Sequence, residues 1–147
     1  MQKIPKAHIP PTQYNSNFLL HEKKEIEKHY DFLKAKLVGP QGHKTLQCEG
    51  QYNCVGVLYE YKIKYDGKKT IVNIQKPDIP YDIDAHMFKD KHLCLYDNIW
   101  DSHKQHIYSD IIPWVHEWCV AYEIYKITHK WELPFTPHNR SIGQNAV

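Results

Sequence analysis

The sequence predicts a single α+β domain in the order helix, antiparallel meander, long loop, helix. Three observations carry this prediction: apolar residues recur at helical spacing near the N-terminus, they alternate with polar residues through 57–65, and an aromatic-rich helical stretch follows an irregular loop. A chain of 147 residues with 41% hydrophobic content suits one core of ordinary size. We expect one domain over 1–147, with a leader at 1–14 and a flexible tail at 139–147.

The first helix is predicted to follow the leader, with Asn15 or Ser16 as its N-cap. Its apolar residues recur at intervals of three, four and seven: Leu19, Ile26, Tyr30, Leu33 and Leu37. The lysines on its outer face suit a solvated surface or a docking face for a partner. Glycine and proline at 39–42 predict its end.

Residues 57–65 alternate between apolar and polar side chains, which is typical of a strand with one buried face. Asp66-Gly67 supplies turn residues before a further strand at 70–74, and a shorter strand is expected around 44–51. The prolines that follow lack ladder donors and predict the end of the sheet. We therefore expect a meander of about four strands.

The stretch 82–110 is longer than a passive connection needs, which indicates a functional loop. Ser109 or Asp110 is predicted to cap the last helix, with Pro113 tolerated in its first turn. This helix continues toward residue 131 and is apolar nearly all round, so we expect it to be mostly buried. Its tryptophans are predicted core residues: Trp114, Trp118 and Trp131.

Composition disfavours two classes of partner. The net charge is only +2 and the lysines are scattered, so the basic footprint of a nucleic-acid binder is weak. No stretch approaches the roughly 18 apolar residues that span a bilayer, and the N-terminus lacks the apolar core of a signal peptide. We expect a cytoplasmic protein with no nucleic-acid or membrane partner.

Cys94 is the strongest candidate for chemistry. It stands between two leucines just after a cluster of histidine and lysine, and nearby cations favour the nucleophilic thiolate. We predict that Cys94 lies in a shallow groove and is at least partly accessible, with a buried inert thiol as the alternative. Cys48 and Cys54 fall in or beside predicted strands and are expected to pack inertly.

Cys119 lies three residues after His116 in the last predicted helix, and packing is the favoured interpretation. A zinc site is the alternative, because the chain contains enough nitrogen and sulfur donors for one. The donors are His92, Cys94, His103, His106, His116 and Cys119. Since no Cys-x-x-Cys pair is present, we expect no metal.

The segment 86–96 resembles the active-site segment of ubiquitin-conjugating enzymes, in which a His-Pro-Asn motif precedes a Leu- or Val-Cys-Leu step. Leu93-Cys94-Leu95 matches that step, and His86 stands eight residues before the cysteine. Met87-Phe88 occupies the place of Pro-Asn, so the usual asparagine for oxyanion or loop support is missing.

A closer resemblance is to the ubiquitin-conjugating-like proteins of bacterial cyclic-oligonucleotide-based anti-phage signalling operons (CBASS), in the short type II form. It covers roughly 44–138. The residues that carry it are His86, Leu93-Cys94-Leu95-Tyr96, Trp100, Ile111-Ile112-Pro113-Trp114, Glu117-Trp118, Tyr122-Glu123-Ile124, Thr128, Trp131 and His138. His129 departs from the glycine that tends to follow Thr128 in that family, which we expect to affect a helix end and not the chemistry.

The resemblance implies a ubiquitin-conjugating-enzyme-like fold and a thioester-transfer activity. Cys94 would carry the C-terminus of a cGAS-like nucleotidyltransferase as a thioester and pass it to an amine, with lysine as the expected acceptor. His86 would brace the loop beside Cys94 and aid proton transfer, with a packing role as the alternative. No cofactor is expected, because the energy arrives with a thioester or comes from an ATP-dependent activating enzyme in trans.

Two other functions remain open from the sequence. One is a non-catalytic module of the same fold that scaffolds the nucleotidyltransferase. The other is a redox-active or metal-binding protein that uses Cys94 and the histidines.

Overall fold

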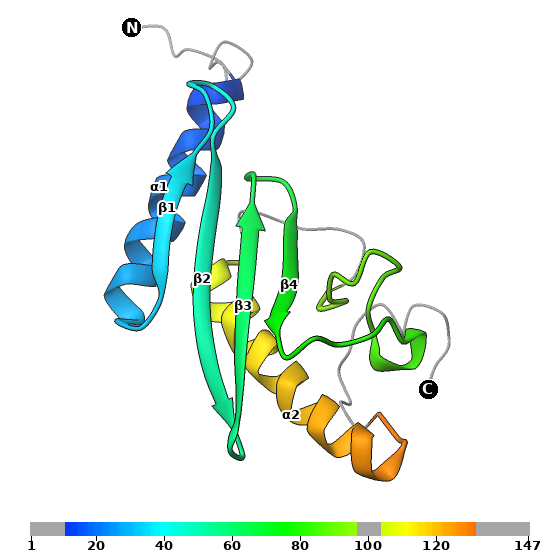
Figure 1. Cartoon of the computed structure of the whole chain (residues 1–147). Helices are drawn as coiled ribbons and strands as arrows, with labels where there is room; N and C mark the ends of the chain where they lie inside the picture. Colours follow the sequence, from blue (N-terminus) through cyan, green and yellow to red (C-terminus); the bar gives the residue numbers. More distant parts are fainter. Residues whose placement is uncertain (1–10, 97–103, 132–147) are drawn as a thin grey trace, which may run out of the picture.

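A computed structural model describes residues 11–96 and 104–131 of the chain (Figure 1). The helix α1 (Pro11–His29) is followed by the strands β1 (Lys34–Val38), β2 (Thr45–Cys54), β3 (Val57–Tyr65) and β4 (Thr70–Lys76). The 3-10 helix η2 (Ile83–Ala85), the π-helix η3 (Ile107–Ile111) and the helix α2 (Ile112–Thr128) come next. The predicted α+β order of helix, four-stranded meander, long loop and helix is confirmed.

Both ends of the first helix lie earlier than predicted. α1 begins at Pro11, ahead of the caps expected at Asn15 or Ser16. It ends at His29, and the helical spacing of apolar residues that continues beyond it belongs to a strand, Lys34–Val38. This strand pairs with β2 along its whole length, so backbone hydrogen bonds to a distant partner override the local pattern.

The strands form one antiparallel sheet in the order β1-β2-β3-β4. The alternation predicted for 57–65 is confirmed by its inward-facing side chains, all of them buried: Tyr59, Tyr61, Ile63 and Tyr65. The predicted turn at Asp66-Gly67 is also present, because the Asp66 carboxylate accepts the backbone N–H groups of Lys68 and Lys69 at 2.8 and 2.9 Å. β3 and the turn after it therefore follow from local sequence signals, whereas β1 depends on its pairing with β2.

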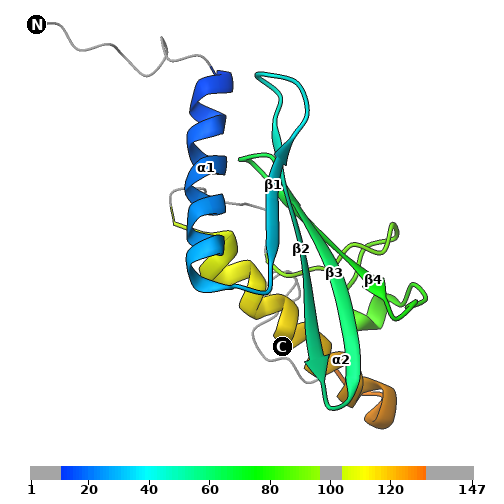
Figure 2. The ribbon, with the colours of Figure 1, turned by 60° about the vertical axis from the view of Figure 1, so that its left-hand side comes forward.

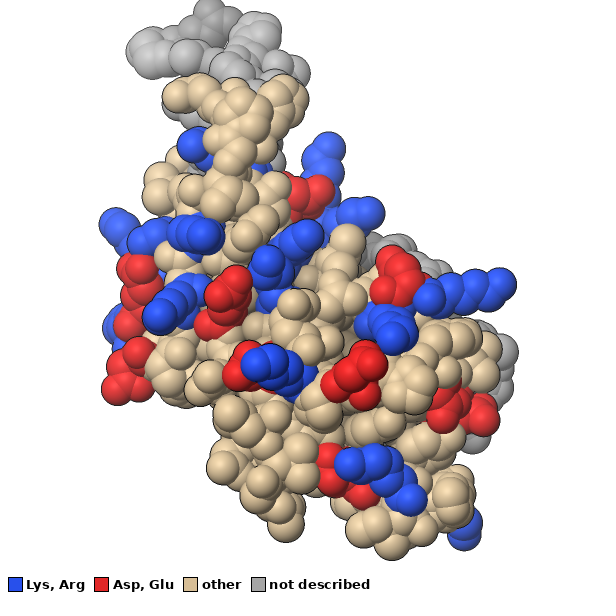
Figure 3. Space-filling model, viewed as in Figure 1, with Lys and Arg blue, Asp and Glu red and all other residues tan. Residues whose placement is uncertain are grey.

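Both long helices lie on the same side of the sheet (Figure 2). From β3, the Tyr61 hydroxyl lies 2.9 Å from Nε2 of His116 in α2, and the Tyr59 hydroxyl donates to the Glu123 carboxylate. The opposite face mixes acidic and basic side chains, as Figure 3 shows. The core thus fills the space between the sheet and the helices. No described helix has both the length and the apolar content needed to cross a bilayer.

α2 starts differently from the prediction. No side chain caps it, and neither Ser109 nor Asp110 precedes it directly, because η3 extends the helical path backward to Ile107. The Asp110 carboxylate instead accepts the backbone N–H of His106 at 2.8 Å, at the start of η3. Pro113 lies in the first turn of α2 as expected.

α2 was expected to be mostly buried, and this prediction was wrong because one side of the helix is exposed. Trp118 is fully buried, but Trp114 and Trp131 are only partly buried. On the other side of the helix Val120, Ile124 and Ile127 are exposed, Ile127 to 80%. The sheet and the segment 82–85 cover only one side of α2. The helix ends at Thr128, before Trp131.

Candidate active site

The loop that carries Cys94 folds back onto β4. The backbone N–H of Leu93 donates to the Val72 carbonyl at 2.9 Å, and His92 forms an isolated antiparallel bridge with Asn73. A second bridge joins Met87 to Leu93 within the loop. The cysteine segment is therefore fixed against the edge of the sheet, between the meander and α2 as predicted.

The structure brings the two predicted site residues, His86 and Cys94, together. The Cys94 backbone N–H donates to the His86 carbonyl at 2.9 Å. His86 ends η2 in the left-handed conformation with φ of 55°, and its ring lies 5.1 Å from the Trp131 ring. Both residues line the same cavity. This contact runs through the backbone, so it places the two residues side by side without involving the His86 ring.

Two side chains of α2 hold the loop in place. The Trp118 indole Nε1–H donates to the Ala85 carbonyl at 2.9 Å, and the Tyr125 hydroxyl donates to the Asp82 carboxylate at 2.8 Å. Asp82 also caps η2 by accepting the Asp84 backbone N–H at 2.9 Å. Neither Asp82 nor Tyr125 was predicted from the sequence as a site residue. An aspartate before a short helical turn is a local sequence signal for an N-cap, so the capping role of Asp82 could have been predicted. Its bond to Tyr125 could not, because nothing in the local sequence indicates a partner on α2.

A cavity of about 690 Å³ opens beside Cys94. Its wall is mostly aromatic and aliphatic: Tyr81, Ile83, Met87, Phe88, Tyr125 and Trp131. The polar lining residues are Asp84, His86, Lys89 and His129. Ile83 and Phe88 are exposed, so the cavity faces solvent. A groove at the cysteine was predicted, and this cavity fits it.

The prediction that Cys94 itself is partly accessible was wrong. Its exposed fraction is 4%, against 0% for Cys48, 2% for Cys54 and 0% for Cys119. All four are free thiols. The Leu93 backbone is bonded to β4, and the Cys94 backbone is bonded to His86 at the end of η2. The Cys94 side chain therefore lines the cavity but is almost fully shielded from solvent.

The electrostatics of Cys94 also differ from the expectation. Burial raises the pKa of its thiol to about 12, and the negative charge of Asp90 acts in the same direction. Two of the basic side chains expected to favour the thiolate have acidic partners: Lys91 Nζ lies 3.7 Å from Asp78, and the His92 ring contacts the Asp90 carboxylate. The pKa of Asp90 is lowered, chiefly because its carboxylate accepts a hydrogen bond from the backbone N–H of His92. The resting thiol is therefore protonated at neutral pH.

The other cysteines pack as predicted. Burial raises the pKa of Cys48 to about 12, and it raises the pKa of Cys119 as well. His116 also packs against neighbouring aromatic side chains. Its ring stacks on that of Tyr52 with the ring centres 4.2 Å apart, and its Nε2 is hydrogen-bonded to the Tyr61 hydroxyl. Burial lowers its pKa.

The zinc donors considered from the sequence do not converge in the described part of the chain. The one group of His, Cys, Asp and Glu side chains close enough there to share an ion is His21, Glu22 and His106. His92, Cys94 and the His116–Cys119 pair are not in it. His103 lies outside the described residues, as do Trp100 and His138.

Comparison with known proteins adds one finding to this geometry. The family model for the type II CBASS E2 protein matches residues 22–139. That range includes the sheet, the loop with His86 and Cys94, and α2. A search of curated proteins found no match. Since the family model spans most of the sequence and the whole candidate site, the chain belongs to the family of type II CBASS E2 proteins.

Proposed function

We propose that this protein is a ubiquitin-conjugating-like cysteine acyltransferase of anti-phage defence, with the corresponding fold. Cys94 carries the C-terminus of a cGAS-like nucleotidyltransferase as a thioester and passes it to an amine on a target protein in the cytoplasm. The observation that carries the proposal is the cysteine of a family-matched loop lining a solvent-facing cavity. The site carries no cofactor of its own in this proposal.

The reaction has two balanced steps. In the first, the Cys94 sulfur attacks the activated carboxyl carbon, the bond to the activating group breaks, and the thiol proton is lost. In the second, an amine attacks the thioester carbon, the carbon–sulfur bond breaks, the nitrogen loses one proton and the leaving sulfur gains one. The activated carboxyl comes from an ATP-dependent activating enzyme in trans. The nucleotidyltransferase and this activating enzyme are therefore the expected partners.

The protonated resting thiol makes proton transfer the critical event. His86 lines the same cavity as Cys94 and is the proposed proton acceptor as well as a brace for the loop. The aromatic wall gives an incoming peptide apolar surface to bind. A thiol that is protonated until the substrate arrives is also protected from alkylation and oxidation.

A second function has its own support. The burial of Cys94 and the raised pKa of its thiol are what a non-catalytic module would show. In that case the cavity would bind the tail of the nucleotidyltransferase without forming a covalent bond, and the protein would act as a scaffold.

Co-expression with the nucleotidyltransferase and the activating enzyme separates the two functions. We expect wild-type protein to support linkage of the nucleotidyltransferase to targets, and Cys94→Ala to abolish it. Cys48→Ala, Cys54→Ala and Cys119→Ala are matched controls, because each removes a buried thiol, and they should retain linkage. If Cys94→Ala still supports linkage, the catalytic proposal falls. A stable complex without any linkage in wild type would favour the scaffold.

A further inference from the structure

A group of metal-binding side chains lies where α1 meets η3, away from the loop of Cys94. His21 and Glu22 come from α1, and His106 immediately precedes η3. One ligand atom from each residue lies within 4.8 Å of the other two. Two imidazoles and one carboxylate form a donor set that zinc binds, with water in the fourth position.

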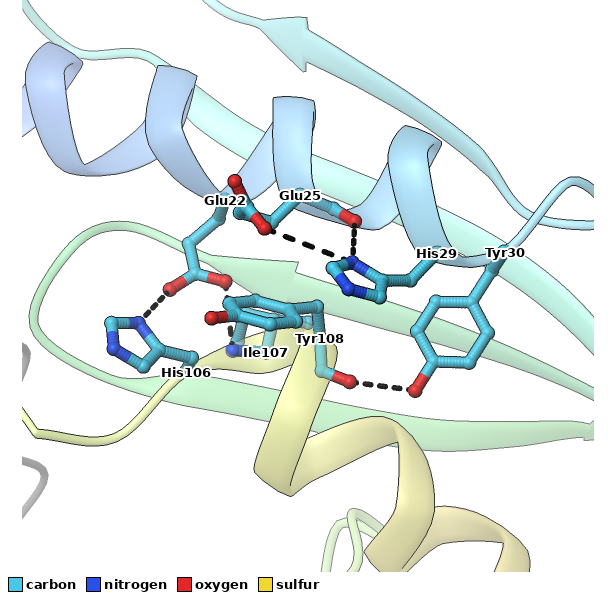
Figure 4. Close-up of polar contacts among 7 residues, drawn as sticks. All are labelled: Glu22, Glu25, His29, Tyr30, His106, Ile107 and Tyr108. Carbon is cyan, nitrogen blue, oxygen red and sulfur yellow. Dashed lines mark hydrogen bonds and ion pairs between the residues drawn. The ribbon is translucent and has the colours of Figure 1, made fainter.

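Glu22 and His106 are held in place (Figure 4). The Glu22 side chain is only 2% exposed, its Oε2 lies 2.7 Å from Nδ1 of His106, and its Oε1 accepts the Ile107 backbone N–H at 2.9 Å. Asp110 in turn holds the His106 backbone N–H at 2.8 Å. Two of the three donors are therefore positioned before any ion binds, which lowers the cost of forming a site.

His21 supplies the adjustable donor. It is exposed, and its ring centre lies 5.6 Å from that of His106. Ligand atoms around a tetrahedral zinc ion lie about 3.3 Å apart, because each is about 2.0 to 2.1 Å from the metal. Zinc binding needs a rotation of the exposed His21 side chain toward the other two donors, and it needs the 2.7 Å distance between His106 Nδ1 and Glu22 Oε2 to widen by about 0.6 Å.

We propose that His21, Glu22 and His106 bind a zinc ion that joins α1 to the start of η3. The ion takes the place of the hydrogen between His106 Nδ1 and Glu22 Oε2, and the displaced proton leaves to solvent. Because the ion binds the folded chain at two elements far apart in sequence, it stabilises the fold. This site is independent of the Cys94 reaction, and nothing in the proposal depends on that reaction.

The test uses the full chain, freed of metal by a chelator and titrated with zinc in a calorimeter. We expect one equivalent to bind, and zinc at about a hundred times its Kd to raise the Tm by roughly 5 to 10 °C. His21→Ala should weaken binding at least tenfold while leaving the Tm of the metal-free protein unchanged, since His21 is exposed. Glu22→Gln should weaken binding by a similar factor and tests the carboxylate directly.

His29→Ala is the matched control. His29 is an exposed histidine of the same helix, and its Nδ1 contacts the Glu25 carbonyl at 2.9 Å and not the cluster. It should bind zinc as wild type does. Cobalt as a substitute should show no thiolate charge-transfer absorption, because no cysteine belongs to the site. A His21→Ala protein that binds zinc as tightly as wild type, a thiolate band with cobalt, or no zinc binding in the micromolar range overturns the proposal.

Discussion

The α1–η3 junction and the β4 edge of the sheet bury a reactive group in opposite ways. At the junction, the Glu22 carboxylate receives the Ile107 N–H and the His106 ring. At the β4 edge, Cys94 is nearly as buried, but the charge that acts on its thiol is the carboxylate of Asp90. Hydrogen-bond donors around a buried polar group offset the cost of its desolvation. Burial without such donors disfavours the charged form of the group. The first region therefore holds α1 to η3 through hydrogen bonds, whereas the second keeps its thiol protonated.

The largest effect is expected from Trp118, which packs in the core and also bonds the Ala85 carbonyl before the Cys94 loop. Trp118→Ala should lower the free energy of unfolding by about 3 to 5 kcal/mol, since the side chain is fully buried. Trp118→Phe keeps most of the ring and loses the bond to the Ala85 carbonyl, so it should cost about 1 to 3 kcal/mol. Urea denaturation measures both. Wild-type stability in Trp118→Ala would contradict the placement of α2 against the sheet and loop.

Glu22 and Cys94 should differ in what their removal costs. Glu22→Ala leaves the buried Ile107 N–H and the His106 ring without their acceptor, so we expect a loss of about 2 to 4 kcal/mol. Cys94→Ala removes only one buried sulfur and leaves no hydrogen-bonding group without a partner. It should lower the free energy of unfolding by about 1 kcal/mol. Denaturation of the two metal-free variants under the same conditions makes the comparison. If both variants lost the same free energy of unfolding, the claim that the Glu22 side chain is bonded into the fold and the Cys94 side chain is not would be contradicted.

A smaller effect is expected at His129, which lines the cavity of Cys94 and ends α2 with φ of 61°. A left-handed backbone costs a residue with a side chain roughly 1 kcal/mol more than it costs glycine. His129→Gly should therefore raise the free energy of unfolding by about 1 kcal/mol. Lys130→Gly is the control, because Lys130 is not among the positive-φ residues, and it should bring no gain. A loss of stability in His129→Gly would show that the side chain contributes more than its backbone strain costs.

The smallest expected effect is on thiol reactivity. Asp90→Asn removes a negative charge that raises the pKa of Cys94, so the pKa falls and the thiolate fraction at neutral pH grows. We expect iodoacetamide to alkylate Cys94 about two to three times faster, as followed by mass spectrometry. Asp78→Asn is the control, an exposed carboxylate paired with Lys91. An unchanged or slower rate in Asp90→Asn would contradict the sign of the electrostatic argument.

The elements predicted correctly are those with local causes. The alternation through β3 and the turn at Asp66 follow from side chains within a few residues of one another. β1 was missed because its apolar residues fit a helix and only pairing with β2 decides their structure. His129 lies at the end of α2, where its departure from the family pattern was expected to act, although the helix was predicted to continue toward residue 131.

The site was predicted in position but not in its environment. The place of Cys94 in the loop, with His86 beside it, followed from the sequence and its resemblance to a family. Its burial did not, since it depends on the loop pairing with β4 through Leu93. The predicted activation by cations failed for a similar reason: which carboxylates Lys91 and His92 meet is set by tertiary structure.

The most direct test of the central claim is the intact mass of the protein itself. Wild-type protein, incubated with the nucleotidyltransferase, the activating enzyme and ATP, is analysed without reducing agent. We expect an adduct of one nucleotidyltransferase less one water, attached at Cys94 and released by added thiol. In Cys94→Ser the adduct should be absent or resist thiol and yield only to hydroxide, because an oxyester replaces the thioester. An adduct that survives thiol in wild type, or one that persists in Cys94→Ala, would contradict the assignment of Cys94 as the acyl-carrying nucleophile.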